Sequence, residues 1–196
     1  LDLEKENPKV RERYGKGTAK VQGDAAPRLM EQFLMARRLV EAGVRCVTLS
    51  FSFWDFHGSN FARCRENVPD LDRGVSALID DLAERNMLDD VLIIVVGEFG
   101  RTPSITKNGT DPKPGRGHWA PCYTGLFAGG GVRGGQVIGK SDKNGGYPAS
   151  TPYHPNDIGA TIYQTLGVDP ASMIVDQQGR PIHLNTGKVL DVLYTG

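Results

Sequence analysis

Val91-Leu-Ile-Ile-Val-Val-Gly97, followed at once by Glu98-Phe-Gly-Arg-Thr-Pro103, is the stretch that decides the fold predicted for this chain of 196 residues. Its six consecutive apolar residues, five of them β-branched, are typical of a strand buried on both faces of a parallel sheet. A carboxylate, an arginine and a proline follow where open α/β sheets bind their ligands, at the carboxyl end of a strand. We therefore expect a buried strand that leads directly into a functional loop.

The segments on either side predict an α/β fold with a parallel crossover. Apolar residues at helical spacing predict helices at 27–43, 67–87 and 155–166. Residues 44–51 are strand-like, so this strand, the helix at 67–87 and the strand at 91–97 should form a right-handed parallel unit. Further strands are expected at 123–128 and 136–139, with a hairpin or tail near the C-terminal end.

The length favours one well-filled domain. Residues 1–24 are polar and charged, with a short helix pattern around Asn7–Tyr14, and are expected to form an arm or linker. The domain itself is predicted to occupy residues 25–196. Because the chain begins with Leu1 and lacks a signal-peptide pattern, we expect a fragment or a processed form, whose compartment the composition leaves open.

Composition and charge argue against several functional classes. Lys+Arg and Asp+Glu both number 23, so no net charge favours nucleic acid or a membrane surface as partner. No apolar run approaches the roughly 20 residues of a transmembrane helix. Cys46, Cys64 and Cys122 form no CxxC pair and so indicate neither a zinc knuckle nor a disulfide framework. Cys46 lies inside a strand pattern and is predicted to be a buried thiol.

Polar residues able to carry chemistry follow two of the predicted strands. Asp55 and His57 come just after the strand at 44–51, and Glu98 and Arg101 come just after 91–97. His118 lies in the long loop that follows. Because the carboxyl ends of parallel strands meet at one sheet edge, these side chains are expected to share a site.

This mixture of carboxylates and imidazoles suits a divalent metal ion. An Asp, Glu and His donor set fits Zn²⁺, Mn²⁺ or another borderline ion better than Ca²⁺. Arg101 would offer a fixed fork of donors to a phosphate or sulfate oxygen. A metal ion together with an arginine is the equipment for displacement at an anionic ester.

Each of these residues also has an ordinary structural interpretation. Asp55-x-His57 occurs in surface turns with a capping aspartate, and Glu98 could pair with the nearby Arg101 or cap a helix. His118, beside a tryptophan, could be a packed loop histidine. Their joint placement at one predicted sheet edge is what favours the site.

Other suggestive residues lack such placement. His154 and His183 follow no predicted strand of this edge and are expected to be structural or exposed. The glycine cluster Gly129–Gly135 does not precede a convincing helix, so a turn is preferred over a phosphate cradle.

Several of these stretches together resemble the bacterial family called domain of unknown function 1501, a branch of the alkaline phosphatase and sulfatase superfamily. The most specific matching string is Gly97-Glu-Phe-Gly-Arg-Thr-Pro103. The other matching stretches are Ala36–Arg45, Trp54-Asp-Phe-His57, Leu71–Leu82, Gly117-His-Trp119, Ala128–Gly139, Ala160–Tyr163 and Leu166-Gly167.

The resemblance implies an alkaline phosphatase-like, three-layer αβα sandwich with a mainly parallel sheet and a pair of metal ions at the carboxyl ends of its strands. In that likeness Asp55 and His57 match the first ligand group, Glu98 matches the aspartate of the next pair, and His118 matches a later histidine. Position 99 is Phe where the superfamily has a metal-binding His. The nucleophile strand is not found, so the chain is expected to be the C-terminal part of the catalytic domain. The family also suggests bacterial export, to the periplasm or outside the cytoplasm.

These observations predict a metal-dependent hydrolase of phosphate or sulfate esters whose substrate is a small anionic ester. Asp55, His57, Glu98 and His118 would bind the metal, with Zn²⁺ first and Mn²⁺, Mg²⁺ or Ca²⁺ as alternatives, and Arg101 would be the catalytic residue that holds the anion. The alternative is a non-catalytic binding or structural domain that retains the fold. A homo-oligomer is a third option, because a partial sheet would expose an apolar edge that a second copy could cover.

Overall fold

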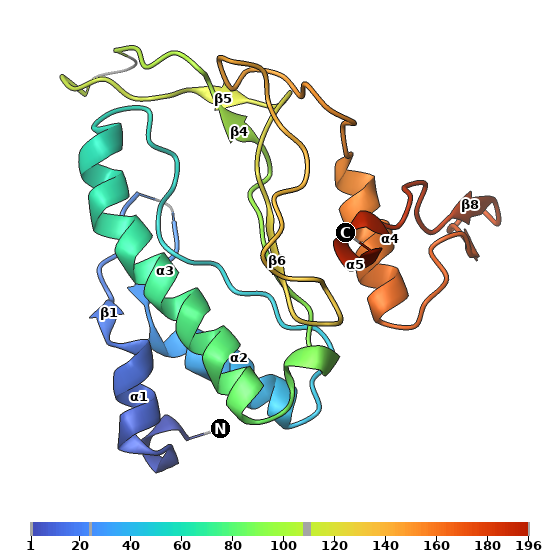
Figure 1. Cartoon of the computed structure of the whole chain (residues 1–196), viewed down its shortest axis with the longest axis horizontal. Coiled ribbons are helices and arrows are strands. Elements are labelled where there is room, and N and C mark those ends of the chain that lie inside the picture. Colours follow the sequence, from blue (N-terminus) through green and yellow to red (C-terminus); the bar gives the residue numbers. More distant parts are fainter. Residues whose placement is uncertain (1, 24, 108–110, 196) are drawn as a thin grey trace. The chain divides into compact units, whose positions relative to one another are not determined.

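The computed structural model describes residues 2–23, 25–107 and 111–195 (Figure 1). The chain divides into two compact units. The first unit comprises Leu1–Leu88 and Phe99–Tyr123. The second comprises Asp89–Glu98 and Thr124–Gly196. Of the residues predicted to form a site, Glu98 belongs to the second unit and the others to the first.

In its described residues, the first unit consists of three main helices and two short pairs of strands. The start of α1 follows a local sequence signal: Asn7 accepts a hydrogen bond from the backbone N–H of Lys9 at 2.9 Å, and Pro8 is the first helical residue. The elements of this unit are the 3₁₀ helix η1 (Leu3–Lys5), α1 (Pro8–Tyr14), β1 (Gly17–Thr18), β2 (Arg28–Leu29), α2 (Glu31–Glu41), α3 (Asn60–Glu84), β4 (Gly100–Arg101) and β5 (His118–Trp119).

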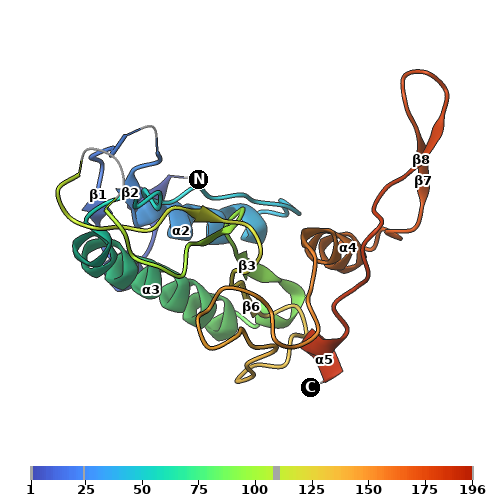
Figure 2. The same cartoon turned by 90° about the horizontal axis from the view of Figure 1, so that it is seen from above.

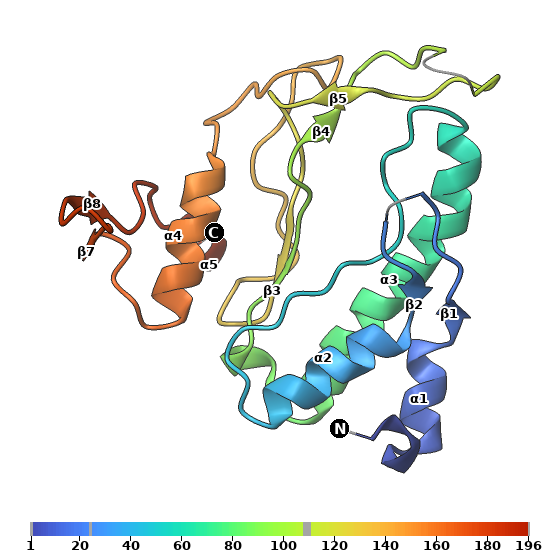
Figure 3. The ribbon, with the colours of Figure 1, turned by 180° about the vertical axis from the view of Figure 1, so that it is seen from behind.

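Helices α1, α2 and α3 pack on one another around one apolar core (Figure 3). Tyr14, Leu34 and Leu82, one from each helix, are almost fully buried. Gly74 lets α2 and α3 approach closely, because a Cβ there would lie 2.6 Å from the ring of Phe33. The core of this unit is therefore interhelical rather than a filled sheet.

The second unit combines one longer helix with two short strand pairs. Helix α4 begins with a capping box in which Asp157 Oδ2 accepts from the backbone N–H of His154 at 2.7 Å. Figure 2 shows the β7–β8 hairpin, whose residues are exposed on both strands. The elements of this unit are β3 (Ile93–Val95), β6 (Leu126–Ala128), α4 (Pro155–Thr165), β7 (Met173–Val175), β8 (Pro181–His183) and α5 (Val192–Thr195); the 3₁₀ helix η2 (Leu88–Asp90) spans the division between the units.

The helices were predicted in place, but two of them differ in their bounds. Helix α4 lies where the apolar spacing places it, whereas α2 begins at Glu31 rather than at Pro27, because Arg28 and Leu29 form β2. Helix α3 begins at Asn60 rather than near residue 67, and it continues through Pro69. Proline removes only one helical hydrogen bond, and Val75 and Leu82 bury the following turns against the core, so the helix persists across it.

The predicted three-layer αβα sandwich with a mainly parallel sheet is wrong. Among the described residues, the named strands are two or three residues long, and they form four separate antiparallel pairs: β1–β2, β3–β6, β4–β5 and β7–β8. Such short paired segments cannot make the extended central layer that the resemblance implied.

The two strands of the predicted crossover explain the error. In the stretch 91–97 only Ile93 is buried, Val96 is 47% exposed, and the strand pairs antiparallel with β6. Residues 44–51 and 136–139 contain no strand, and Cys46 is exposed rather than buried. A β-branched run favours extended backbone, but it does not specify the partner or the direction of pairing.

No helix in the described part of the chain is both long enough and apolar enough to cross a membrane.

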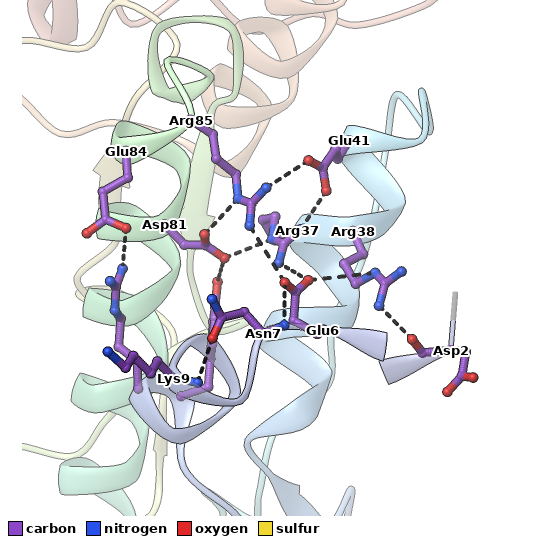
Figure 4. Close-up of polar contacts among 12 residues, drawn as sticks. Asp2, Glu6, Asn7, Lys9, Arg37, Arg38, Glu41, Asp81, Glu84 and Arg85 are labelled. Carbon is purple, nitrogen blue, oxygen red and sulfur yellow. Dashed lines mark hydrogen bonds and ion pairs between the residues drawn. The ribbon is translucent and has the colours of Figure 1, made fainter. Parts of the chain in front are cut away.

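A buried ionic network joins the N-terminal segment to α2 and α3 (Figure 4). Arg37 of α2 is 1% exposed, and its Nε lies 2.8 Å from an oxygen of Asp81 on α3. The same guanidinium pairs with Glu41 at 2.5 Å and with Glu6. Tyr14 of α1 donates a hydrogen bond to Asp81 over 2.9 Å. One buried cation is thus shared among carboxylates from three segments of the chain.

The same network fixes the ionisation of its acidic members. Burial opposes the charge of Asp81, but hydrogen bonds from Arg85 and Tyr14 outweigh it, so its pKa lies below the ordinary value of 3.8. Burial also opposes the charge of Glu6, and the hydrogen bond from Arg37 outweighs it, so that pKa lies below 4.5. Both carboxyl groups are therefore ionised at neutral pH.

Acid is expected to destabilise the first unit through these two groups. A carboxyl whose pKa is lower in the folded than in the unfolded state adds stability above its unfolded pKa and loses it as pH falls through the folded pKa. The contribution of Asp81 and Glu6 should therefore be complete at pH 6 and decline below about pH 4. Urea unfolding between pH 3 and 7, followed by circular dichroism, measures this.

The variant Asp81→Asn isolates this contribution from that of the other carboxyl groups. It should be less stable than the wild type at pH 6, and the difference between the two should shrink toward pH 3. A constant difference across the whole range would contradict the expectation.

Candidate metal centre

A short loop after residue 51 presents Asp55 and His57. Phe56 between them is buried, which anchors the loop and leaves its two neighbours partly exposed. The loop is held locally, because Trp54 Nε1 donates to the Phe51 carbonyl at 2.7 Å and the His57 N–H donates to the Asp55 carbonyl at 3.0 Å. Asp55 and His57 therefore flank a buried residue in the sequence, and their own side chains remain partly exposed.

An antiparallel pair of strands presents the other two members of the site. In the β4–β5 ladder, Arg101 is directly opposite His118. Side chains at opposite positions of an antiparallel pair lie on the same face. Gly100 permits this close pairing, because a Cβ there would lie 2.0 Å from the Cys122 carbonyl oxygen.

The long loop between β4 and β5 is bound to the loop that carries His57. Gly58 forms an isolated bridge with Pro114, and the Arg116 N–H donates to the Phe56 carbonyl at 3.1 Å. A Cβ at Gly115 would lie 2.2 Å from the His57 carbonyl, so only glycine allows this approach. These backbone contacts hold His57 and His118 together.

Asp55 lies at the centre of the resulting cluster. Its Oδ1 is 2.8 Å from His118 Nε2, and its Oδ2 is 3.1 Å from His57 Nδ1. The two imidazole rings are 4.9 Å apart between centroids. One ligand atom from each of these three residues lies within 4.8 Å of the others. The three side chains are about half exposed, so the cluster is open to solvent.

Arg101 is paired with the same carboxylate. Its Nη1 lies 2.5 Å from Asp55 Oδ1, and its side chain is 20% exposed. The backbone of this segment is supported by Arg116, which donates to the Arg101 carbonyl at 2.9 Å and to the Thr102 carbonyl at 2.6 Å. One arginine therefore contacts the acidic group, and a second holds the main chain beneath it.

The charge of Asp55 is set by these neighbours. Burial opposes ionisation, but the hydrogen bonds from Arg101 and His118 outweigh it, so the pKa of Asp55 lies below its ordinary value. Asp55 is thus a carboxylate at neutral pH, which is the form that binds metal ions.

Phe99 has a packing role that the sequence did not reveal. Its ring centroid is 4.4 Å from that of His118, and the Arg101 guanidinium lies 5.8 Å from the Phe99 centroid. Phe99 directly precedes β4 and lies two residues before Arg101, and this closeness in sequence is the signal that links the two. Instead of donating to a metal, Phe99 packs against two members of the site.

Glu98 is the predicted ligand that this cluster does not include. It is exposed and belongs to the second unit, and the group of ligand atoms within 4.8 Å of one another consists of Asp55, His57 and His118. The expected convergence of parallel strand ends does not occur either. The β4–β5 pairing and the loop contacts at Gly115 bring the other residues together.

The donor set can be compared with the requirements of a metal ion. Ligand atoms about 2.0–2.2 Å from a tetrahedral zinc ion lie roughly 3.3–3.6 Å from one another. The 2.8 and 3.1 Å separations are hydrogen-bonding distances to two different oxygens of Asp55, so these side chains would move apart to share an ion. One carboxylate with two imidazoles matches the three protein ligands of catalytic zinc sites, which leave one position open. In the type and number of their donors, Asp55, His57 and His118 therefore fit a zinc ion.

A family model described as "Protein of unknown function (DUF1501)" matches residues 1–193. No curated protein and no solved structure matches the chain. All the residues of the cluster lie inside the matched segment.

Proposed function

This chain belongs to the DUF1501 family of proteins of unknown function, and we propose that it acts as a metal-dependent hydrolase of phosphate or sulfate esters. The observation that carries the proposal is the group formed by Asp55, His57 and His118, whose ligand atoms lie within 4.8 Å of one another. The likeness to alkaline phosphatases and sulfatases is part of this proposal and rests on the sequence motifs, not on the fold.

In this proposal the three clustered residues hold one divalent ion, with zinc preferred for its match to two imidazoles and a carboxylate. A divalent ion there supplies Lewis acidity toward a phosphoryl or sulfuryl oxygen. Arg101 binds the ester anion through its planar fork of donors. Phe99 restrains the ring of His118 from one side, so the imidazole keeps its orientation.

Zinc binding is the first test of this function. Protein stripped with a chelator and titrated with Zn²⁺ in a calorimeter should bind about one ion per chain, since three protein ligands make one site. The loaded protein should hydrolyse 4-nitrophenyl phosphate or 4-nitrophenyl sulfate at a rate that rises with zinc occupancy. His118→Ala should lower both zinc affinity and turnover. Failure to take up zinc would refute the proposal.

The second candidate is a binding or structural domain without catalysis. The ion pair between Arg101 and Asp55 favours it, because each group already satisfies the charge of the other. A protein that binds zinc tightly, yet hydrolyses neither aryl phosphate nor aryl sulfate, would support this candidate over the enzyme.

A further inference from the structure

One oxygen of the site serves two different partners. Asp55 Oδ1 accepts from Arg101 Nη1 at 2.5 Å and lies 2.8 Å from His118 Nε2. Arg101 is the residue proposed to hold the anion, whereas Asp55 and His118 are proposed to hold the cation. The residues proposed to bind the anion and those proposed to bind the cation therefore meet at this one oxygen of Asp55.

While no cation is bound, this oxygen keeps Arg101 paired with Asp55, and the arginine is not free to bind an anion. A guanidinium engaged by Asp55 has fewer donors left for an ester oxygen, and its charge is already balanced. A divalent cation on Asp55 would draw charge from the same oxygen and would repel the neighbouring guanidinium.

The guanidinium changes partner in this exchange, and His118 gives up its hydrogen bond to Asp55 when its Nε2 becomes a ligand. The main chain of Arg101 is held by its β-pairing with His118 and by the hydrogen bond from Arg116. Phe99 lies under the side chain, with 5.8 Å between its ring centroid and the guanidinium carbon. The side chain is 20% exposed, so a released guanidinium is accessible to a ligand from solvent.

We infer that a divalent cation and an oxyanion bind this site in a coupled order, in which the cation takes Asp55 and thereby frees Arg101 to bind the anion. The inference rests on the proposed function and adds its regulation: the anion site is completed by the cation. Coupling of this kind is reciprocal, so the anion must tighten cation binding by the same factor.

Inorganic phosphate is the probe for the anion. Calorimetric titration of phosphate into metal-free protein, and into protein carrying one equivalent of Zn²⁺ without excess, should give roughly 5- to 50-fold tighter binding to the loaded form. Zinc titrated into protein saturated with phosphate should show the same factor.

The variant Arg101→Gln separates this exchange from direct contact between the metal and the anion. Without the competing guanidinium, Asp55 should bind Zn²⁺ more tightly than in the wild type, by roughly 3- to 10-fold. Phosphate should bind the zinc-loaded variant roughly 10-fold more weakly, because a charge-assisted fork is lost. Arg101→Lys keeps the charge without the fork and should lie between the two proteins. Arg65→Gln, at an exposed arginine of α3, is the control and should change neither affinity.

Each of three results would contradict the coupled binding of cation and anion. Phosphate affinity that is equal with and without bound zinc would overturn the coupling while leaving the proposed zinc site intact. Weaker zinc binding by Arg101→Gln and Arg101→Lys would also overturn it, because Arg101 would then serve only to orient Asp55. Absence of zinc binding in the wild type would overturn both the coupling and the proposed function.

Discussion

Replacing Arg37 by methionine is expected to lower the free energy of unfolding of the first unit by about 3–5 kcal/mol. Methionine approximates the length of the arginine stem but supplies no charge. It would leave Asp81 and Glu6 close to each other in an almost buried setting, with the cation between them removed. The larger part of the loss is the cost of burying carboxylates that have lost one cationic partner, although Asp81 keeps its 2.8 Å bond from Arg85.

The neighbouring arginine provides a matched control. Arg38 is on the same helix, is 21% exposed, reaches Glu6 at 3.9 Å and donates to the Asp2 carbonyl at 2.7 Å. Because its ion pair is long and partly exposed, Arg38→Met should cost about 1 kcal/mol, much less than Arg37→Met. Urea unfolding of both variants at pH 7, followed by helical circular dichroism, measures the two effects. Equal losses of unfolding free energy in the two variants would show that the burial of Arg37 adds nothing to its contribution.

The second large effect is expected at the metal centre. Asp55→Asn should weaken Zn²⁺ binding by more than about 100-fold, because changes to groups that only support a ligand already cost 10- to 100-fold. Asparagine keeps the shape of the side chain but removes the charge that lies between His57 and His118. It also releases Arg101, whose uncompensated charge would repel the incoming cation.

Asp72→Asn is the control for this measurement, because Asp72 is exposed on α3 in the same unit and the substitution makes the same change in charge. Calorimetry of both variants, with circular dichroism to verify folding, gives the comparison. If the well-folded Asp55→Asn variant bound zinc as tightly as the Asp72→Asn variant, Asp55 would not be a ligand.

The helices could be predicted because their signals are local. The apolar spacing of α2 and α4, with a proline at the first turn of α4, is legible within a dozen residues. The start of α3 at Asn60 was missed because the apolar spacing that predicted the helix is clear only after Pro69. Its true role inside the helix depends on distant core contacts of residues such as Leu82, which no local pattern encodes.

The sheet could not be predicted because pairing is not local. Ile93 pairs with Ala128, and nothing in the composition of either strand specifies that partner or an antiparallel direction. The same strand composition suits a buried parallel sheet and a short exposed ladder. Choosing the first, from the β-branched run and then from the superfamily likeness, led to the wrong architecture.

The sequence predicted part of the candidate site. The expected reason for its assembly, converging ends of parallel strands, was wrong. The structure groups Asp55, His57 and His118, with Arg101 bonded to Asp55, but through an antiparallel register and a glycine contact. Their role in binding a metal stays a prediction, as does that of Glu98. The residue types could be recognised in the sequence. The contacts that bring these residues together join positions tens of residues apart, so no local pattern predicts them.

The bond from Tyr14 to Asp81 also has a consequence for the timing of folding during synthesis. The two residues are 67 positions apart, and ribosomes add about 5–20 residues per second, so about 3–13 s separate their synthesis. Helix α1 has only seven residues, too few to be stable alone in water. Although α1 is made early, we therefore expect it to remain unfolded until the last turns of α3 have left the ribosome.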